Sequence, residues 1–188
     1  MDIRRALEAY RPFNEQEERD QAAMLRAMDA HADIFLRNCE CMHMTASAWI
    51  VNARRDRVLM AWHNIYRSWS WLGGHADGER DLLAVAVREA REESGLTHVR
   101  PVSEDIFSLE ILTVNGHEKR GKYVSSHLHL NVTYLLEGDE SDDLHAKPDE
   151  NSGVRWFDLD GAADASSEAW MRARVYQKLN EKLRACFL

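Results

Sequence analysis

The segment Gly73–Leu96 reads GGHADGERDLLAVAVREAREESGL and carries three local structural signals. A Gly-Gly pair opens it, strong helix formers follow, and a single glycine closes it. The pattern predicts a break at the Gly-Gly pair and a long helical segment that runs on to Ser94. It also predicts a left-handed conformation at Gly95 after the helix, with Leu96 making the hydrophobic contact of a C-terminal cap.

The apolar residues of this helix share one face, which we expect to pack against a sheet. They are Leu82, Leu83, Ala86 and Ala90. Continuing the row in steps of three or four residues reaches Glu89 and then Glu93. Two carboxylates therefore continue an apolar stripe, where a surface helix would carry Leu or Ala. Glu92 lies one step to the side, with Arg88 beside it at i, i+4 spacing.

Several carboxylates that are half-buried side by side are costly unless a cation compensates them. Arg88 neutralises one, and the others indicate a metal ion. Oxygen ligands on one rigid helix favour a hard cation, Mg²⁺ first and Mn²⁺ second, which keeps water ligands and bridges to substrate phosphates. Such acidic runs are also typical of solvated helix faces. The flanking glycines and the alignment with the apolar row favour the metal site.

The segment resembles the signature of the Nudix hydrolases, in which Gly-x5-Glu-x7-Arg-Glu-apolar-x-Glu-Glu-x-Gly-apolar forms a loop, a helix and a second loop. Gly74 matches the opening glycine, Arg88 and Glu89 match the Arg-Glu pair, and Glu92 and Glu93 match the paired acids. Three further defined positions also match: Ala90 fills the first apolar position, Gly95 the closing glycine and Leu96 the final apolar position.

One position departs from this signature. Arg80 stands where the pattern has its first Glu, and Glu79 lies one place earlier. Either Glu79 substitutes from a loop that is one residue shorter, or the position is not essential in this chain.

The resemblance implies a Nudix-type α/β/α sandwich with a mixed β-sheet. It also implies an enzyme that hydrolyses a pyrophosphate bond in a nucleoside diphosphate linked to another moiety, with Mg²⁺ or Mn²⁺ as cofactor. By resemblance, Glu89, Glu92 and Glu93 bind the metal or orient water, and Arg88 holds Glu89 in place. The backbone at Gly74 can approach the metal or a phosphate because the residue has no side chain.

Further site residues are predicted outside the signature. Glu150 lies in a loop before a short strand, where several Nudix members place an additional catalytic acid, and an ordinary acidic loop residue is the alternative. Trp69 and Trp71 share one strand face by period 2 and are candidates to stack on a base, with core packing as the alternative. His127 and His129 share the polar face of a strand and are candidates to contact phosphate or ribose, with solvated or hydrogen-bonded strand histidines as the alternative. A transition-metal site built from them is the least favoured interpretation.

Periodicity predicts the remaining elements and two regions. We expect an N-terminal helical extension at residues 1–41, packed on a Nudix domain at 42–188. The extension is predicted to contain helices over Asp2–Tyr10 and Glu15–Ala32. Asn14 should cap the second helix, with Glu17 as its reciprocal partner in a capping box. The apolar stripe of this helix is formed by Ala22, Leu25, Met28 and Ala32. Strands are predicted at His43–Val51, Arg57–His63, Tyr66–Leu72, Ile106–Val114, Ser125–Leu136 and Val154–Phe157. A closing helix is predicted over Ser166–Ala185, with a stripe of Trp170, Val175, Leu179 and Leu183.

Composition narrows the class of protein. With 188 residues, 45% hydrophobic and 30% charged, the chain can bury one substantial core. A net charge of -8 argues against a nucleic acid polymer as partner. The resemblance to the Nudix hydrolases implies a small nucleoside diphosphate derivative as partner instead. An odd set of three cysteines, with no signal peptide or membrane segment recognised, favours a cytoplasmic protein. A homodimer is an open alternative to the monomer.

Two other functions stay open. One is a Nudix-fold nucleotide-binding or sensor domain that has lost catalysis, although the three late acids are present here. The other is an enzyme like isopentenyl-diphosphate isomerase, which would need a cysteine and a glutamate in the pocket. Cys39 and Cys41 precede the first strand without the surroundings expected for that chemistry.

Overall fold

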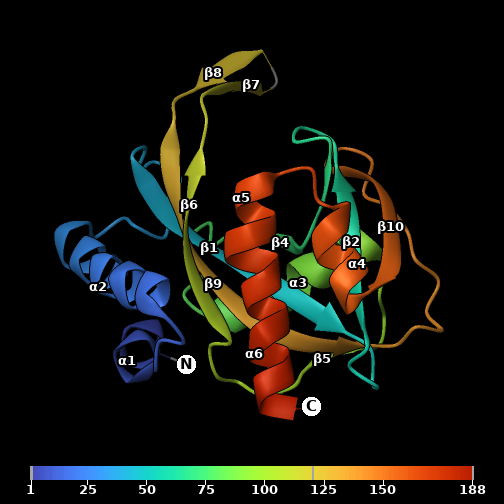
Figure 1. Ribbon diagram of the computed structural model, residues 1–188. Coiled ribbons are helices and arrows are strands. Elements are labelled where there is room, and N and C mark those ends of the chain that lie inside the picture. The colour runs from blue at the N-terminus through green and yellow to red at the C-terminus, as the bar shows by residue number, and fades with distance from the viewer. Residues whose placement is uncertain (1, 120, 188) are drawn as a thin grey trace.

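One large mixed sheet forms the centre of the protein (Figure 1). The structure is a computed structural model that describes residues 2–119 and 121–187. Met1 and Leu188, which end the two predicted regions, lie outside the described residues, as does Arg120. The sheet strands are β1 (Met42–Val51), β2 (Arg57–His63), β3 (Ser68–Ser70), β4 (Leu72–His75), β5 (Val99–Pro101), β6 (Ser108–Val114), β9 (His127–Gly138) and β10 (Asn151–Asp158).

The central strand order is β10-β2-β1-β9-β5, with β3 on β2, β4 on β1 and β6 on β9. β1 and β9 run parallel, and the other recorded pairs are antiparallel. A separate hairpin joins β7 (His117–Lys119) to β8 (Lys122–Val124). The helical segments are α1 (Ile3–Ala9), α2 (Glu15–Ala30), α3 (Leu82–Ser94), α4 (Leu159–Ala165), α5 (Ala169–Met171), the π-helical turn η1 (Arg172–Tyr176) and α6 (Gln177–Phe187).

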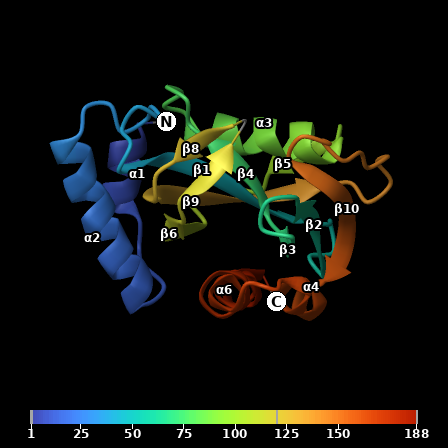
Figure 2. The same cartoon turned by 90° about the horizontal axis from the view of Figure 1, so that it is seen from above.

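Helices cover both faces of the sheet, which confirms the predicted Nudix-type sandwich. Figure 2 shows α3 on one face, α4 and α6 on the other, and α1 and α2 at one side. Two buried apolar clusters fill the layers, one on the α3 side and one on the α4–α6 side. Within the described residues, no helix combines the length and the apolar composition needed to cross a bilayer.

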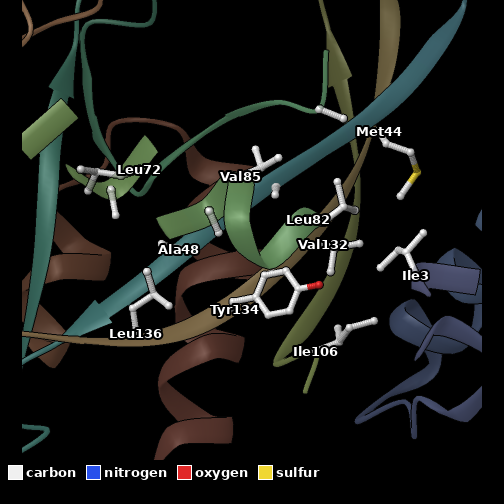
Figure 3. Close-up of a cluster of buried hydrophobic side chains, with 14 of the residues drawn as sticks. Ile3, Met44, Ala48, Leu72, Leu82, Val85, Ile106, Val132, Tyr134 and Leu136 are labelled. Atoms are coloured by element: carbon white, nitrogen blue, oxygen red, sulfur yellow. The ribbon is translucent and has the colours of Figure 1, made fainter. Parts of the chain in front are cut away.

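The strands β1 and β9 divide their side chains between these two layers. Figure 3 shows Met44 and Ala48 of β1 on the side where Leu82 and Val85 of α3 pack. The alternate residues of β1 include Trp49, which packs in the other layer against α4 and α6. Val85 is fully buried and Leu83 only half-buried, so Val85 takes the core place that the helical wheel gave to Leu83.

The Gly-Gly pair does not break the chain as predicted, because it lies inside β4. Gly73 pairs with Ser47 and Gly74 pairs with Ala46 across β1. A Cβ on Gly73 would lie 2.5 Å from the carbonyl oxygen of Ala46, so this residue permits close strand packing and does not form a turn. The helical segment begins later, at Leu82, because the Oδ1 of Asp81 caps it by accepting from the N–H of Ala84 at 3.2 Å.

The closing helix is interrupted by η1 and begins later than predicted. Trp170, placed in its buried stripe by the sequence, is 49% exposed. It precedes the π-helical turn, whose wider winding rotates the faces of the segments on its two sides relative to each other. Val175, Leu179 and Leu183, after that change, are fully buried as predicted.

The second N-terminal helix has the predicted Asn14 cap, but neither the reciprocal Glu17 bond nor the predicted buried stripe. The Oδ1 of Asn14 accepts from the N–H of Glu17 at 3.0 Å, as expected. The Glu17 carboxylate accepts from the N–H of Phe13 at 2.8 Å, so it does not make the reciprocal capping-box bond to Asn14. Ala22 and Ala32 are exposed, whereas the apolar side chain of Met24 is fully buried, because one face of α2 packs on β6. Leu25 and Met28 are partly buried as neighbours of this core.

A buried charge cluster joins α2 to α6. The Nζ of Lys182 lies 2.8 Å, and that of Lys178 3.2 Å, from the Oε1 of Glu17. Lys178 also lies 2.9 Å from Glu110 of β6. Burial alone would raise the pKa of Glu17, but the charges of the two lysines and hydrogen bonds to the carboxylate outweigh burial and lower this pKa to about 2. The C-terminal helix therefore binds the N-terminal segment through ionised groups.

A network of hydrogen bonds connects Glu110 of this cluster to polar side chains of β9 and β1. The amide of Asn131 on β9 donates to the Oε2 of Glu110 at 3.1 Å. The hydroxyls of Thr45 and Ser47 on β1 donate to the Oδ1 of Asn131 at 3.0 and 2.9 Å. These bonds satisfy polar groups that burial would otherwise penalise. They fix the floor of the cavity described next.

Candidate metal and substrate site

A cavity of about 1150 Å³ lies over the polar half of one sheet face and reaches the end of α3. Its lining includes residues of β1, β4, α3, β9 and the loop before β10. The floor is polar because His43, Thr45 and Ser47 alternate along β1. Farther along the same face, Trp49 packs on α4 and α6. The helices thus cover the apolar half of the face and leave the polar half to the cavity.

Three carboxylates converge at one end of this cavity. Glu89 and Glu93 come from α3 and Glu150 from the loop before β10, and each offers an oxygen within 4.8 Å of the others. The Oε2 of Glu93 accepts from the backbone N–H of Gly73 at 3.2 Å. Burial, followed by the charges of Glu150 and Glu89, raises the pKa of Glu93 to about 9. Ionised carboxylates this close together repel one another, and a cation bound between them would offset that repulsion.

Arg88 contacts Glu89, with Nη2 3.1 Å from its Oε1. Burial raises the pKa of Glu89, and the hydrogen bond from Arg88 opposes that rise. Gly74 faces this carboxylate, since a Cβ on Gly74 would lie 2.6 Å from the Cδ of Glu89. Only glycine lets the β4 backbone and the Glu89 carboxylate approach so closely.

Short-range contacts hold Glu150 beside α3. The side-chain amide of Asn151 donates to the carbonyl of Glu93 at 3.0 Å. Its Oδ1 accepts from the N–H of Lys147 at 3.1 Å. The Nζ of Lys147 lies 3.3 Å from Glu150 and 3.1 Å from Glu92. These bonds bring a loop residue from far along the chain to the end of the helix.

The predicted helix end is confirmed. Gly95 has a φ of 78°, in the left-handed region, and its N–H donates to the carbonyl of Arg91 at 2.9 Å. Leu96 is 2% exposed, as expected for the hydrophobic contact after the cap. The helix therefore ends at Ser94, one residue after Glu93 and beside the cavity.

A family model for the NUDIX domain matches residues 42–179, well over half of the chain. The chain belongs to the Nudix family. Among curated proteins no match was found. The Nudix fold recurs in solved structures. A C. elegans Ap4A hydrolase complex is 22% identical with a TM-score of 0.55, covering 76% of this chain and 96% of that one.

Two other solved structures show the same fold at similarly low sequence identity. A NUDIX-family hydrolase from Clostridium perfringens is 20% identical with a TM-score of 0.52, covering 77% of this chain and 97% of that chain. An ADP-ribose pyrophosphatase from Streptococcus suis is 17% identical with a TM-score of 0.52, covering 77% and 92%. At these identities the likeness concerns the fold alone.

Nudix enzymes typically use divalent metals, and the donor set of this Nudix chain fits one. The converging ligands are all carboxylate oxygens, which suit Mg²⁺ and then Mn²⁺. The pKa of Glu93 is raised because its ionised form is buried beside other carboxylates, and a bound cation would stabilise that ionised form. Glu92 lies apart from this set in the described structure, because its exposed side chain pairs with Lys147. Its predicted metal role stays a prediction.

The departure from the Nudix signature is accommodated in the loop before α3. The Oε1 of Glu79 accepts from the backbone N–H groups of Arg80 and Asp81 at 2.7 and 2.8 Å. The Arg80 guanidinium stacks 4.9 Å from the centre of the Phe35 ring. Both residues are exposed, and within the described chain neither lines the cavity. Glu79 therefore orders the loop and does not join the acids.

The two predicted tryptophans separate. Trp71 lines the cavity and makes an edge contact with Tyr176. Trp69 packs between Trp62 and Phe157 instead, and among the described residues it is not part of the lining. Trp69 thus fits the alternative of core packing, because it and Trp71 both pack against the apolar cluster on the α4–α6 side, and its stacking on a base stays a prediction.

His127 and His129 both line the cavity, and their contact with phosphate or ribose stays a prediction. Beside them lie His43 and His75, which the sequence interpretation did not use. The signal was present, because His43, Thr45 and Ser47 alternate along an otherwise apolar strand, as His127, His129 and Asn131 do on β9. Matching these two rows required the parallel register in which His43 pairs with His129.

Proposed function

We propose that the chain is a Mg²⁺-dependent hydrolase that cleaves a pyrophosphate bond in a nucleoside diphosphate linked to another moiety. The observation that carries this proposal is the convergence of the Glu89, Glu93 and Glu150 carboxylates beside Gly74. The cavity of about 1150 Å³ is large enough for such a nucleotide derivative. Mn²⁺ is the second choice of metal.

In this proposal Glu89 and Glu93 anchor the metal, and Glu150 assists. When bound, Mg²⁺ stabilises negative charge on the phosphoryl oxygens. Arg88 holds the Glu89 carboxylate in one orientation through its hydrogen bond. Glu150 lies beside Glu93 and shares a hydrogen bond with it, which places it to hold a proton taken from water.

Positive side chains of the lining supply the phosphate contacts. Arg37 and Lys147 both line the cavity, in a chain whose net charge is -8. Arg37 is oriented by two bonds of 2.6 Å to the carboxylate of Asp77, which fixes its position at the rim. Trp71 offers an aromatic surface for the base, and the histidines of β9 lie on the floor.

The test is hydrolysis of a panel of nucleoside diphosphate derivatives with Mg²⁺ and with excess chelator. The panel includes diadenosine polyphosphates and ADP-ribose, because structural neighbours carry these names, and also nucleotide sugars, nucleoside triphosphates and dinucleotide coenzymes. We expect at least one to be cleaved with Mg²⁺ and not with chelator. Tight binding without cleavage of any member would indicate the sensor domain instead.

The isomerase alternative makes a different prediction, namely conversion of isopentenyl diphosphate without phosphate release. The geometry does not favour it. Cys39 is buried and Cys41 exposed, and no cysteine lines the cavity among the residues that the structure describes.

Replacing Gly74 by alanine should weaken the metal site without unfolding the protein. The new Cβ would lie 2.6 Å from the Glu89 carboxyl, whose flexible side chain must move. We expect the Mg²⁺ concentration for half-maximal hydrolysis to rise about 10–100-fold, as when other supports of a metal ligand are lost. Gly153→Ala is the matched control, since its Cβ would meet nothing closer than 3.5 Å. An unchanged Mg²⁺ requirement in Gly74→Ala would contradict the role of this close approach.

A further inference from the structure

Four histidines converge on the cavity floor, apart from the acids. His43 lies on β1, His75 on β4, and His127 and His129 on β9. Each offers one ring nitrogen, and the four nitrogens lie within 4.8 Å of one another. The ring centres of His43 lie 5.0, 4.8 and 5.1 Å from those of His75, His127 and His129. Three strands of the rigid sheet therefore deliver four imidazoles to one point.

Hydrogen bonds assign the tautomer of two of these rings. The Nδ1 of His43 lies 3.2 Å from the carbonyl oxygen of Cys39, and the Nδ1 of His127 lies 2.8 Å from that of Ser125. A carbonyl only accepts, so each Nδ1 carries the proton and each Nε2 keeps a free lone pair. Metal-binding histidines are typically oriented in this way, with the second ring N–H bonded to a backbone carbonyl.

Ordinary packing leaves part of this cluster unexplained. The Nε2 of His127 lies 3.1 Å from the Nε2 of His129, which one hydrogen bond between the two rings can account for. The Nε2 of His43 is buried and has no hydrogen-bond partner within the described chain. A buried acceptor without a partner is costly, and a cation at the centre of the cluster would satisfy it.

Burial favours the neutral, metal-binding form of two of the imidazoles, His43 and His129. Burial, followed by the neighbouring histidines and Arg37, lowers the pKa of His129 to about 2. Burial also lowers the pKa of His43. The positive charge of Arg37 is compensated by its two bonds to Asp77, so it does not exclude a cation.

We propose that His43, His75, His127 and His129 bind one transition-metal ion, Zn²⁺ first. Zn–N bonds of about 2.0–2.1 Å place tetrahedral ligand nitrogens about 3.3 Å apart, close to the 3.1 Å between His127 and His129. Small ring rotations bring in the other two. Imidazole nitrogens select Zn²⁺ where the neighbouring carboxylates select Mg²⁺, so the two ions occupy separate sites.

Four protein ligands complete the coordination of Zn²⁺, which makes this a structural site. The ion ties β1, β4 and β9 together under the cavity and fixes His75, directly after Gly74. The proposal stands independently of the hydrolase activity, because it rests only on the geometry of the four rings.

The test begins with untagged protein that has been stripped with chelator and loaded with excess Zn²⁺. After gel filtration we expect one Zn²⁺ per chain by elemental analysis and a higher melting temperature than that of the stripped protein. Co²⁺ in its place should give the intense visible absorption of a four-coordinate ion. Histidine-selective ¹⁵N NMR of the unaltered protein should show shifts at the ring nitrogens of the cluster upon Zn²⁺ addition.

Variants locate the ion. Replacing His127 and His129 together by asparagine should weaken Zn²⁺ binding by about 100-fold or more, at least the loss seen when supporting groups are removed. His145→Gln, at an exposed histidine outside the cluster, should bind like wild type. Glu89→Gln should also retain Zn²⁺, since it changes only the acids.

Three results would overturn the proposal. The first is wild-type protein that, after stripping, loading with excess Zn²⁺ and gel filtration, retains much less than one Zn²⁺ per chain and shows no histidine shifts. The second is equal Zn²⁺ affinity in the His127/His129 variant and wild type. The third is loss of Zn²⁺ in Glu89→Gln with retention in the histidine variant, which would place the ion on the carboxylates.

Discussion

Glu93→Gln should reduce Mg²⁺-dependent hydrolysis of the substrate found in the panel by about 1,000-fold in kcat. The Glu93 carboxylate lies within 4.8 Å of Glu89 and Glu150 and accepts from Gly73, so it is central among the converging acids. Glutamine keeps the shape and removes the negative charge that holds the cation. A loss on the order of 4 kcal/mol of transition-state stabilisation corresponds to this factor.

The measurement is steady-state kinetics at saturating Mg²⁺, with Glu18→Gln as the matched control. Glu18 is exposed on α2 and far from the acids in the chain, so this variant should retain wild-type turnover. Glu93→Gln should remain folded in chelator, because the raised pKa of this buried carboxyl already favours its neutral form and glutamine keeps a neutral group of the same shape. Wild-type turnover in folded Glu93→Gln would show that the metal is anchored elsewhere.

Glu17→Gln should destabilise the fold by about 3–5 kcal/mol, the usual cost of removing one partner from a buried ion pair. The substitution leaves Lys178 and Lys182 buried, with their ammonium groups deprived of the carboxylate that lies 3.2 and 2.8 Å away. For a chain of this length the midpoint of thermal unfolding should fall by about 6–20 °C. Urea denaturation followed by circular dichroism measures the free energy of unfolding.

The control for this prediction is again Glu18→Gln, which should change the free energy of unfolding by less than about 0.5 kcal/mol. The difference between wild type and Glu17→Gln should also depend on pH. Because the pKa of Glu17 lies at about 2, below its ordinary value of 4.5, its stabilisation is present above pH 4.5 and is lost as the pH falls toward 2. Equal free energies of unfolding for wild type and Glu17→Gln at pH 7 would mean that apolar contacts alone attach the N-terminal helices.

The elements with strong local signals were predictable from the chain. The Asn14 cap, the left-handed Gly95 and the alternation along β9 all appear in the structure as expected. Each depends on residues within a few positions of one another, where sterics and hydrogen bonding act before any tertiary contact forms. Short elements such as β5, the β7–β8 hairpin and α4 were missed, because three to seven residues carry too little periodic signal.

The wrong assignments share a cause. Trp170 was assigned to the buried stripe of one regular closing helix, and the Gly-Gly pair was interpreted as a break in the chain. In the structure a π-helical turn follows Trp170, and the two glycines lie in β4, where they allow close contact with β1 and with Glu89. Such features depend on neighbours that are distant along the chain, so a local pattern does not record them.

The acids of α3 could be predicted from residue spacing because a helix has a fixed geometry, in which residues three and four apart share a face. Their partner Glu150, the cation of Lys147 beside it, and the meeting of four histidines depend on which strands pair and in which register. His43 and His129 become neighbours only through the parallel pairing of β1 with β9. Strand pairing is set by the burial of whole faces across the sheet, a property of the packed chain that no single segment contains.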